Sequence, residues 1–187
     1  MIEFAKSEFD LHSKVLKNFY SQISEISKIS YQFIKALEDG NKILIFGNGG
    51  SAADAQHFAA ELVGRYESNR KALNAVSLTT DSSSITSIGN DFSFDDIFKR
   101  QVSGLANKGD IALGISTSGN SKNVINGLLE ARKKGCSLIA FTGEGGGYIK
   151  EICDTTLQVP SNKTPRIQEM HILTIHIICG IIDNHFK

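Results

Sequence analysis

The 187-residue sequence has no excess of either charge and few cysteines. Lys and Arg together number 20, as do Asp and Glu, so nothing indicates the basic surface that nucleic acids or anionic membranes attract. The three cysteines, Cys136, Cys153 and Cys179, are odd in number and show no CxxC spacing. This usage favours a reducing compartment over a disulfide framework.

Long hydrophobic runs are also missing. The longest, IHIICGII, is short and interrupted by His176, so it does not predict a membrane span. The first residues, MIEFAKSEFD, lack the apolar stretch of a signal peptide. Together these absences predict a cytoplasmic protein whose partners are neither nucleic acids nor membranes.

The length suits one domain with its own core, so we expect residues 1–187 to form a single domain. Between residues 9 and 37 the apolar side chains recur every three or four positions, which predicts an amphipathic helix that ends at Gly40. A helix ahead of the first strand needs a surface to cover. We expect residues 1–40 to pack on a partner subunit, and packing on the chain's own core would give the same pattern.

The rest of the chain alternates between short apolar segments and helical patterns. Short segments rich in Ile, Leu and Val are typical of strands buried on both faces. The five candidates are KILIFG from Lys42, ALNAVSL from Ala72, DIALGI from Asp110, SLIAFTG from Ser137 and TLQVP from Thr156. The alternation predicts an α/β fold, a doubly wound parallel sheet of five strands in flavodoxin-like order. The segment RIQEMHILTIHIICGIIDNHF is apolar nearly all round, which predicts a long buried C-terminal helix and again favours an interface.

Two unusual loops follow the first and third predicted strands, GNGGSAAD and STSGNS. In flavodoxin-like order these strands are neighbours where the winding reverses, so both loops are expected to face one crevice. In the first loop, Gly49 and Gly50 let main-chain N–H groups approach a ligand closely, although a tight turn without a ligand would read the same way. The spacing of Gly47, Gly49 and Ala52 also matches a dinucleotide fingerprint, but Asp81 is the only acidic candidate after the second strand. We expect no nucleotide cofactor.

The second loop carries four hydroxyls, Ser116, Thr117, Ser118 and Ser121. Ser and Thr are common helix caps, which would explain them without a ligand. Neutral donors at a helix N-terminus also suit an oxyanion. Because the loop contains no lysine and is paired with GNGGS, we expect it to hold the phosphate of a sugar phosphate.

Proton chemistry is available on two helices. His57 and Glu61 are four residues apart, so their side chains stack on one helix face, as a metal pair, an acid–base pair or a solvated pair. The final helix adds Gln168 and His176, which lie roughly 12 Å apart along its axis. His176 has apolar neighbours, and such a histidine is more often a core residue than a ligand. A carboxylate and an imidazole together suit enediol chemistry, in which a base moves a carbon-bound proton and an acid serves the oxygens.

Four motifs in order make the chain resemble the phosphoheptose isomerases of the sugar isomerase (SIS) domain superfamily. They are FGNGGSAADAQHFAAELVGRY, IGNDFSFDDIF, GISTSGNSKNVI and RIQEMHILTIHII. The resemblance covers nearly the whole chain and implies the reversible conversion of sedoheptulose 7-phosphate to D-glycero-D-manno-heptose 7-phosphate. This step opens heptose synthesis for bacterial lipopolysaccharide or capsule. The resemblance also implies a homotetramer with active sites at subunit interfaces.

The resemblance further implies the substrate contacts. The phosphate would be held by the four hydroxyls, by Ser51 and by the main chain of Asn48, Gly49 and Gly50. The sugar would be contacted by Asn90, Asp91, Glu61 and Gln168, with Arg65 as a supporting charge.

A zinc ion held by His57, Glu61, Gln168 and His176 is also implied, with Glu61 and His176 serving as base and acid. A zinc-bound glutamate is a poorer base, so the two roles would belong to different states, or the metal would position the C1 and C2 oxygens. Pro165 departs from the small or acidic residue of relatives, which removes any carboxylate that assists there.

The main alternative is a non-catalytic SIS module, such as the tetrameric partner of the bacterial replication initiator protein. It would share the phosphate loop, but it would have no need for His57, Glu61, Gln168 and His176, so their presence favours catalysis. A regulatory SIS domain of a transcription factor would need a DNA-binding segment, and none is seen in the 187 residues. A nicotinamide enzyme has only the glycine fingerprint in its favour.

Overall fold

The computed structural model describes residues 1–187, which fold around one parallel sheet. Its strands are β1 (Ile43–Gly47), β2 (Ala75–Ser77), β3 (Ile111–Ser116), β4 (Ser137–Thr142) and β5 (Thr155–Gln158). They lie in the order β2-β1-β3-β4-β5, and every neighbouring pair is parallel. The predicted doubly wound sheet of five strands in flavodoxin-like order is therefore confirmed.

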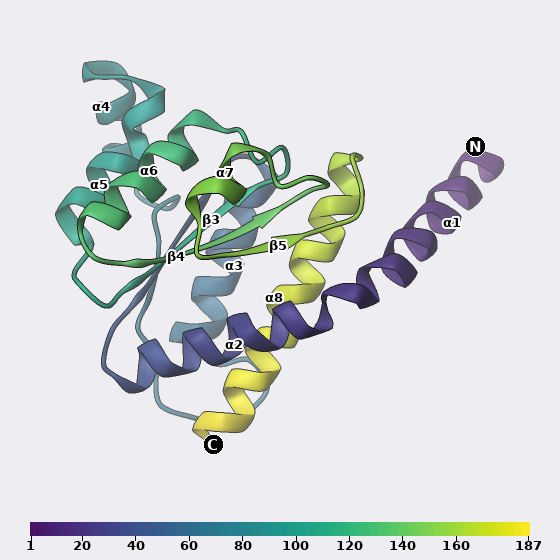
Figure 1. The fold of residues 1–187 in the computed structure, drawn as a ribbon, viewed down its shortest axis with the longest axis horizontal. Coiled ribbons are helices and arrows are strands. Elements are labelled where there is room, and N and C mark those ends of the chain that lie inside the picture. The colour runs from purple at the N-terminus through teal and green to yellow at the C-terminus, as the bar shows by residue number, and fades with distance from the viewer.

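Helices cover both faces of the sheet. The helical elements are α1 (Ile2–Phe19), the 3₁₀ turn η1 (Tyr20–Gln22), α2 (Ile23–Glu38), α3 (Gly50–Val63), α4 (Ser82–Asp91), the 3₁₀ turn η2 (Phe94–Asp96), α5 (Ile97–Leu105), α6 (Lys122–Lys133), α7 (Gly147–Ile152) and α8 (Thr164–Phe186). One face packs against α2, α3 and α8, and the other against α4 to α7 (Figure 1). None of these helices combines the length and the apolar character that a bilayer span needs.

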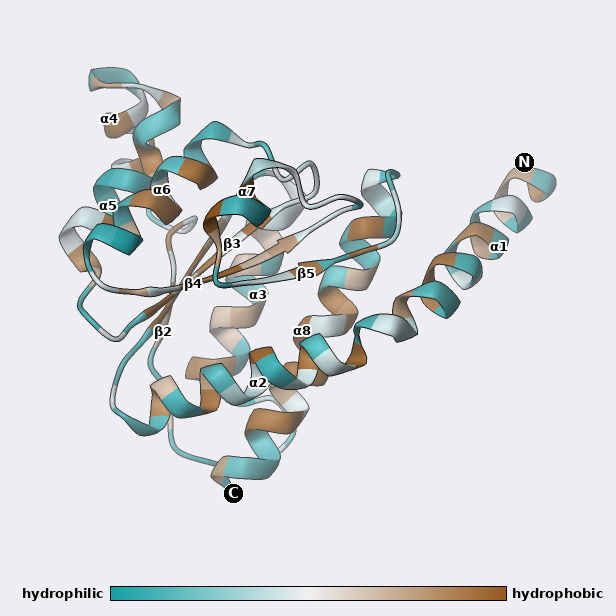
Figure 2. Cartoon of the chain, in the orientation of Figure 1, coloured by the Kyte–Doolittle hydropathy of each residue, from teal (hydrophilic) through white to brown (hydrophobic).

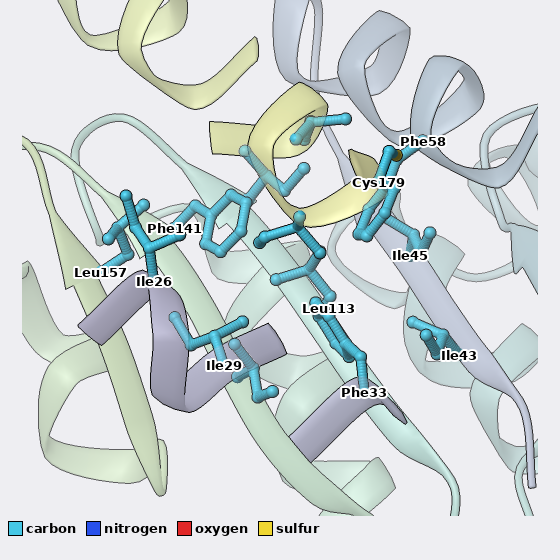
Figure 3. Close-up of a cluster of buried hydrophobic side chains, with 14 of the residues drawn as sticks. Ile26, Ile29, Phe33, Ile43, Ile45, Phe58, Leu113, Phe141, Leu157 and Cys179 are labelled. Atoms are coloured by element: carbon cyan, nitrogen blue, oxygen red, sulfur yellow. The ribbon is translucent and has the colours of Figure 1, made fainter. Parts of the chain in front are cut away.

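The sheet divides the core into two hydrophobic clusters. Along β1, Ile43 and Ile45 belong to the cluster under α2, α3 and α8, while Leu44 and Phe46 belong to the opposite one. Successive side chains of a strand point to opposite faces, so a strand covered on both sides is apolar at every position. The centre of the sheet accordingly colours hydrophobic in Figure 2, and Figure 3 shows Phe33 of α2 facing the strand residues of the first cluster.

The N-terminal segment differs from the single helix predicted over residues 9–37. The 3₁₀ turn Tyr20–Gln22 separates α1 from α2. Helix α2 buries Ile29 and Phe33 fully in the chain's own core, so half of the segment covers this chain rather than a partner. Helix α1 extends away from the body of the molecule, with the N-terminus at its far end (Figure 1).

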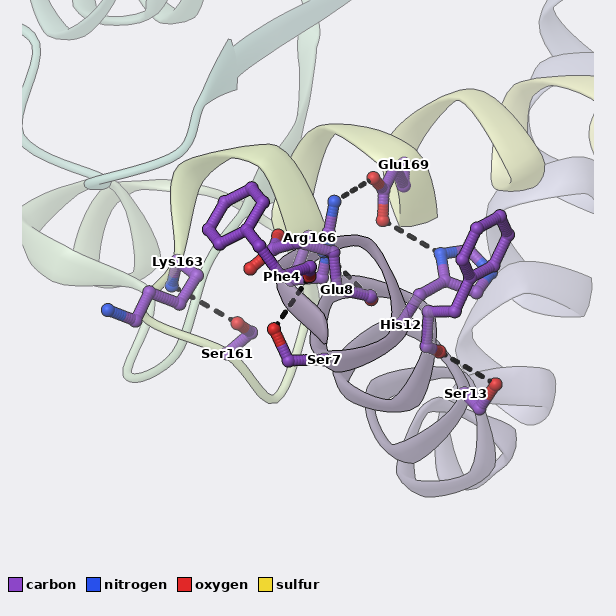
Figure 4. Close-up of polar contacts among 10 residues, drawn as sticks. Phe4, Ser7, Glu8, His12, Ser13, Ser161, Lys163, Arg166 and Glu169 are labelled. Carbon is purple, nitrogen blue, oxygen red and sulfur yellow. Dashed lines mark hydrogen bonds and ion pairs between the residues drawn. The ribbon is translucent and has the colours of Figure 1, made fainter. Parts of the chain in front are cut away.

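Polar contacts hold α1 to the first turns of α8 (Figure 4). The buried Arg166 guanidinium donates to the Glu8 carboxylate at 2.6 Å and also pairs with Glu169. Glu169 in turn bonds His12 Nδ1 at 2.8 Å. Helix α1 is therefore fixed at its middle, where these side chains lie, beside the helix that carries Gln168 and His176.

Two smaller elements also differ from the prediction. Strand β2 is only Ala75–Ser77, shorter than the predicted segment from Ala72, as an edge strand paired on one side can be. Helix α7 was not predicted. It begins at Gly147, the last of three consecutive glycines with positive φ, Gly145 to Gly147, and apolar periodicity does not encode such backbone conformations.

Candidate functional site

The two predicted loops emerge side by side at the carboxyl ends of adjacent strands. Gly47 at the end of β1 pairs with Ile115 of β3, one residue before the hydroxyl loop (residues 116–121). A Cβ on Gly47 would come within 2.8 Å of the Ile115 carbonyl oxygen, so only glycine lets the strands meet here. The glycine loop (residues 47–51) and the hydroxyl loop thus share one crevice, as the strand order predicted.

The glycine loop leads directly into α3. Gly49 has φ +55° and ψ −122°, a conformation that side chains rarely adopt, and it serves as the N-cap of α3 without any side chain. Gly49 and Gly50 are exposed, whereas Ser51 is 3% exposed. No side chain caps the start of α3, where the Ser51 and Ala52 N–H groups donate to the Asn48 and Gly49 carbonyls at 3.0 Å. The exposed main chain of Gly49 and Gly50 at this helix N-terminus suits a bound anion.

The hydroxyls of the second loop cluster together. Ser116 Oγ lies 2.9 Å from Ser121 Oγ and 3.4 Å from Ser118 Oγ, and Thr117 is half-buried beside them in the chain. Gly119 at φ +66° turns the loop so tightly that a Cβ there would collide with the Gly146 carbonyl. Three hydroxyls are therefore focused at the start of α6.

Simple helix capping does not explain these hydroxyls. Ser121 occupies the N-cap position of α6, but its side chain makes no capping hydrogen bond. At α4, by contrast, the Asp81 carboxylate accepts from the Ser84 N–H at 3.0 Å. The Ser121 hydroxyl is thus available for something other than the helix.

We expect Ser121→Ala to separate these two roles. Loss of one hydrogen bond to a charged ligand costs about 1.5–3 kcal/mol, so affinity for inorganic phosphate or a sugar phosphate should fall roughly 10- to 100-fold. The free energy of unfolding should change by less than about 0.5 kcal/mol. Phosphate titration calorimetry and urea unfolding measure the two quantities.

The matched control is Asp81→Ala, which removes a genuine cap. It should lose about 1 kcal/mol of stability and keep its phosphate affinity. If Ser121→Ala instead loses stability to the same extent and binds phosphate normally, the hydroxyl is a cap and not a ligand contact.

A pair of amides joins the two loops. Asn48 donates to Asn123 Oδ1 at 2.9 Å, and Asn123 donates back to Asn48 Oδ1 at 2.8 Å. Asn123 is 3% exposed and lies in the first turn of α6. The sequence reasoning assigned Asn48 but missed Asn123, whose only signal was its place just after the hydroxyl loop. The reciprocal pair sets the spacing between the glycine loop and the hydroxyl loop.

Two turns along α3, an imidazole–carboxylate trio forms from His57, Glu61 and His176. His57 Nε2 lies 3.0 Å from Glu61 Oε1, and the rings of His57 and His176 are 5.1 Å apart at an angle of 70°. His57 remains 43% exposed, whereas Glu61 is 22% exposed. The helical spacing therefore does bring His57 and Glu61 together, and α8 supplies His176 from about 120 residues away in the sequence.

Gln168 lies at the other end of the same helix pair. Its amide packs so closely over Gly50 that a Cβ on that glycine would overlap it. Gln168 is therefore beside the glycine loop, and His176 is beside His57, because α3 and α8 run in the same direction. No group of three or more His, Cys, Asp or Glu side chains is close enough in the chain to hold a metal ion, so the four predicted zinc ligands do not form a closed set here.

One polar group on this face was missed by the sequence reasoning. Asp54 precedes His57 by one turn, and its Oδ2 atom is buried without a hydrogen-bond partner. Burial raises the pKa of Asp54 to about 6, against the opposing effect of nearby His57. Its carboxyl lies on the stripe that runs from Gly50 to Glu61, between the glycine loop and the trio.

The remaining histidine of interest lies outside the site. His171 is fully buried and its Nε2 donates to the Thr142 carbonyl at 3.2 Å. Burial lowers the pKa of His171 to about 4, despite that hydrogen bond. It is a core residue.

Three predicted residues make no hydrogen bond to the two loops or to the trio in this chain. Asn90 and Asp91 are exposed at the end of α4, where Asn90 Nδ2 donates to Asp91 Oδ1 at 2.8 Å. Helix α4 projects from the opposite side of the molecule to α8 (Figure 1). Arg65 lies beyond α3, which ends at Val63, and donates to the Glu67 carbonyl at 3.2 Å.

The chain is similar to known proteins of one family. The SIS domain family model matches residues 9–143. The phosphoheptose isomerase of Aliarcobacter butzleri is 58% identical over 175 residues, which cover 94% of this chain and 91% of that protein. The solved phosphoheptose isomerase of Neisseria gonorrhoeae superposes with a TM-score of 0.92 at 42% identity, covering 97% of this chain and 98% of that one. The solved phosphoheptose isomerase of Francisella tularensis superposes with a TM-score of 0.95 at 36% identity, covering 98% of this chain and 98% of that one.

Proposed function

Because the chain belongs to the phosphoheptose isomerase family of SIS-domain proteins, a family of aldose–ketose isomerases, we propose that it interconverts sedoheptulose 7-phosphate and D-glycero-D-manno-heptose 7-phosphate. The observation that carries this proposal is the arrangement along α3. An anion-binding pair of loops stands at its N-terminus, and the trio of His57, Glu61 and His176 stands two turns further on. A sugar phosphate bound by its phosphate would extend towards the trio.

The phosphate end is served by neutral donors. The hydroxyls of Ser116, Ser118 and Ser121 cluster beside the exposed main chain of Gly49 and Gly50 at the start of α3. Their dipoles and that of α3 favour an anion without a paired cation. Thr117 and Ser51 belong to the same two loops and complete the proposed set.

The trio supports an enediol route. From the ketose, the Glu61 carboxylate takes the proton on C1 while His176 donates a proton to the C2 oxygen, which leaves an enediol. Glu61 then returns its proton to C2, and His176 accepts the proton of the C1 hydroxyl, so the aldose forms with no net gain or loss. The hydrogen bond from His57 occupies one carboxylate oxygen of Glu61 and leaves the other for the carbon-bound proton.

The donor set also fits zinc in kind. Two imidazoles and a carboxylate are ordinary zinc ligands; His57 lies 3.0 Å from Glu61 and its ring is 5.1 Å from that of His176, although the three do not yet converge on one point in this chain. We propose that these three hold the ion, with Gln168 contributing its amide oxygen. When bound, zinc would polarise the carbonyl oxygen of the sugar.

We further propose that the working enzyme is a homotetramer with its active sites at subunit interfaces. Asn90 and Asp91 support this, because they are exposed at the end of α4 and bond each other rather than either loop, which leaves them open to the site of another subunit. Helix α1 also exposes apolar side chains, among them Phe4 and Phe9, which a contact with another subunit would bury. The three free cysteines support a cytoplasmic setting, where the product would enter heptose synthesis for lipopolysaccharide or capsule.

The decisive test is an NMR assay of the purified protein with sedoheptulose 7-phosphate. We expect an aldose 7-phosphate to appear at equilibrium with the ketose. A parallel sample treated with a chelator should lose both its zinc, measured by elemental mass spectrometry, and its turnover. No product from folded protein supplied with zinc would overturn the isomerase proposal and favour the binding-module alternative, whereas full turnover without metal would overturn the zinc proposal alone.

A further inference from the structure

His176 is held by aromatic contacts alone. Its ring makes no hydrogen bond within the chain, whereas His57 bonds Glu61 and His171 bonds Thr142. The edge of His57 meets it at 5.1 Å, and the Tyr66 ring stacks on it with centroids 5.9 Å apart and planes inclined by only 22°. A histidine that exchanges protons needs a fixed ring plane, and another group usually provides it through a hydrogen bond.

Tyr66 is placed by α8 itself. It lies in the loop after α3, and its ring lies against Gly180, one turn beyond His176: a Cβ on Gly180 would be in ordinary contact with Tyr66 Cε1 at 3.7 Å. Residues four apart on a helix lie on one face, so His176 and Gly180 present a continuous seat to the tyrosine. The ring is half-buried there.

A buried ion pair fastens this loop to α8. Asp183 Oδ2 accepts from the N–H groups of Glu67 at 2.9 Å and Ser68 at 2.7 Å, and Asp183 Oδ1 accepts from Arg70 Nε at 2.7 Å. The side chains of Arg70 and Asp183 are 1% and 3% exposed. We call these two residues the clamp.

The clamp also reaches the other partner of the trio. Arg70 Nη2 donates to the Glu61 carbonyl at 2.7 Å, and Arg70 Nη1 donates to the Leu62 carbonyl at 2.9 Å. These are among the last carbonyls of α3, which have no partner within the helix. The main chain of Glu61, the loop bearing Tyr66 and the seat on α8 are thereby joined in one unit.

We propose that Tyr66 is a positioning residue for His176, in that its ring face fixes the plane of the imidazole relative to Glu61. Only the expected effect on kcat rests on the proposed isomerase function. The contact between Tyr66 and His176 is a property of the folded chain and does not depend on it. The face of the ring is what matters, since the Tyr66 hydroxyl makes no hydrogen bond within the chain. A flat hydrocarbon ring should therefore serve as well as tyrosine.

The test compares Tyr66→Phe with Tyr66→Leu. We expect Phe to keep kcat within about twofold, and Leu to lower kcat about tenfold with KM little changed, because the phosphate loops lie at the other end of α3. A second readout needs no turnover: in NMR spectra the ring protons of His176 should lose the ring-current shift of the stacked tyrosine in the Leu variant and retain it in the Phe variant. Tyr31→Leu, on the exposed face of α2, is the control.

Gly180→Leu provides an independent disturbance, since its side chain would displace the Tyr66 ring without altering it. It should reproduce the fall in kcat and the change in the His176 shifts. It therefore tests the proposal even if the Tyr66→Leu protein does not fold. Unchanged kcat and unchanged His176 shifts in either folded variant would overturn the proposal, and so would a Phe variant as impaired as the Leu variant. An inactive wild type would count against the isomerase function, while the NMR shifts would still decide the role of Tyr66.

Discussion

Replacing Glu61 with Gln is expected to lower turnover of sedoheptulose 7-phosphate by about 10²- to 10⁴-fold, the usual contribution of a general base. The Gln amide has the same shape and can still meet His57, which lies 3.0 Å from the carboxylate in the wild type. It cannot accept a carbon-bound proton. KM should change far less than kcat, because the phosphate is held by the glycine and hydroxyl loops. Steady-state kinetics with NMR identification of the product measure both constants.

The matched control is Glu151→Gln, the same substitution on the exposed surface of α7. It should leave kcat and KM unaltered. If Glu61→Gln retained wild-type turnover, another group would have to be the base, and Asp54 would be the next candidate because its carboxyl lies on the same face of α3. Zinc content must be measured for each variant, so that a lost metal is not mistaken for a lost base.

Replacing Asp183 with Ala is expected to lower the free energy of unfolding by about 3–5 kcal/mol. The substitution leaves the Arg70 guanidinium buried without its partner, which is the costly way to break an ion pair. It also removes the acceptor of the Glu67 and Ser68 N–H groups. Urea unfolding at one fixed protein concentration measures the loss.

An exposed pair gives the matching control. Glu3 and Lys6 are 88% and 67% exposed, so Glu3→Ala should cost less than about 1 kcal/mol. An Asp183→Ala protein that loses no more than the control would show that the clamp contributes little. In that event the loop bearing Tyr66 would have to be held by its packing on Gly180.

The contribution of Asp183 to the free energy of unfolding should decrease as the pH is lowered. Burial alone would raise the pKa of Asp183, but the N–H groups of Ser68 and Glu67 and the charge of Arg70 hold it below its ordinary value. A depressed pKa means that the carboxylate stabilises the fold fully above the unfolded pKa of about 3.9. The stability gap between wild type and Asp183→Asn should therefore be constant near neutral pH and shrink as the pH falls below about 4. A gap that persists in acid would contradict this account.

Much of the fold follows from local patterns. The five apolar segments predicted as strands all form strands of one parallel sheet, because burial on both faces requires apolar side chains at every position. The alternation of strands and helices predicted a doubly wound parallel sheet, and the flavodoxin-like order expected for it is the order observed. Two local predictions were wrong. A single helix was predicted over residues 9–37, but the turn at Tyr20–Gln22 interrupts it although the apolar period continues on both sides. Helix α7 was not predicted, because it depends on glycine backbone conformations.

The site was predictable where a single element carries it. His57 and Glu61 meet because helical geometry places residues four apart on one face. The hydroxyl loop was visible as composition, but its meaning was open between capping and anion binding. The absence of a capping hydrogen bond from Ser121 and the closeness of Ser116 to Ser121 favour the second reading, and both are facts of three-dimensional placement.

Taken alone, the sequence determined the fold class, the strand order, the two loops and the identity of the polar side chains. The spacing of residues along the chain is enough for this, because the period of a helix or a strand decides which side chains share a face. Tertiary structure alone decided that Asn123 bonds Asn48, that Tyr66 stacks on His176, and that Arg70 and Asp183 join the end of α3 to α8. These contacts join residues about 75 to 115 positions apart. Their geometry depends on how α3, α6 and α8 pack on the sheet, which no local spacing records.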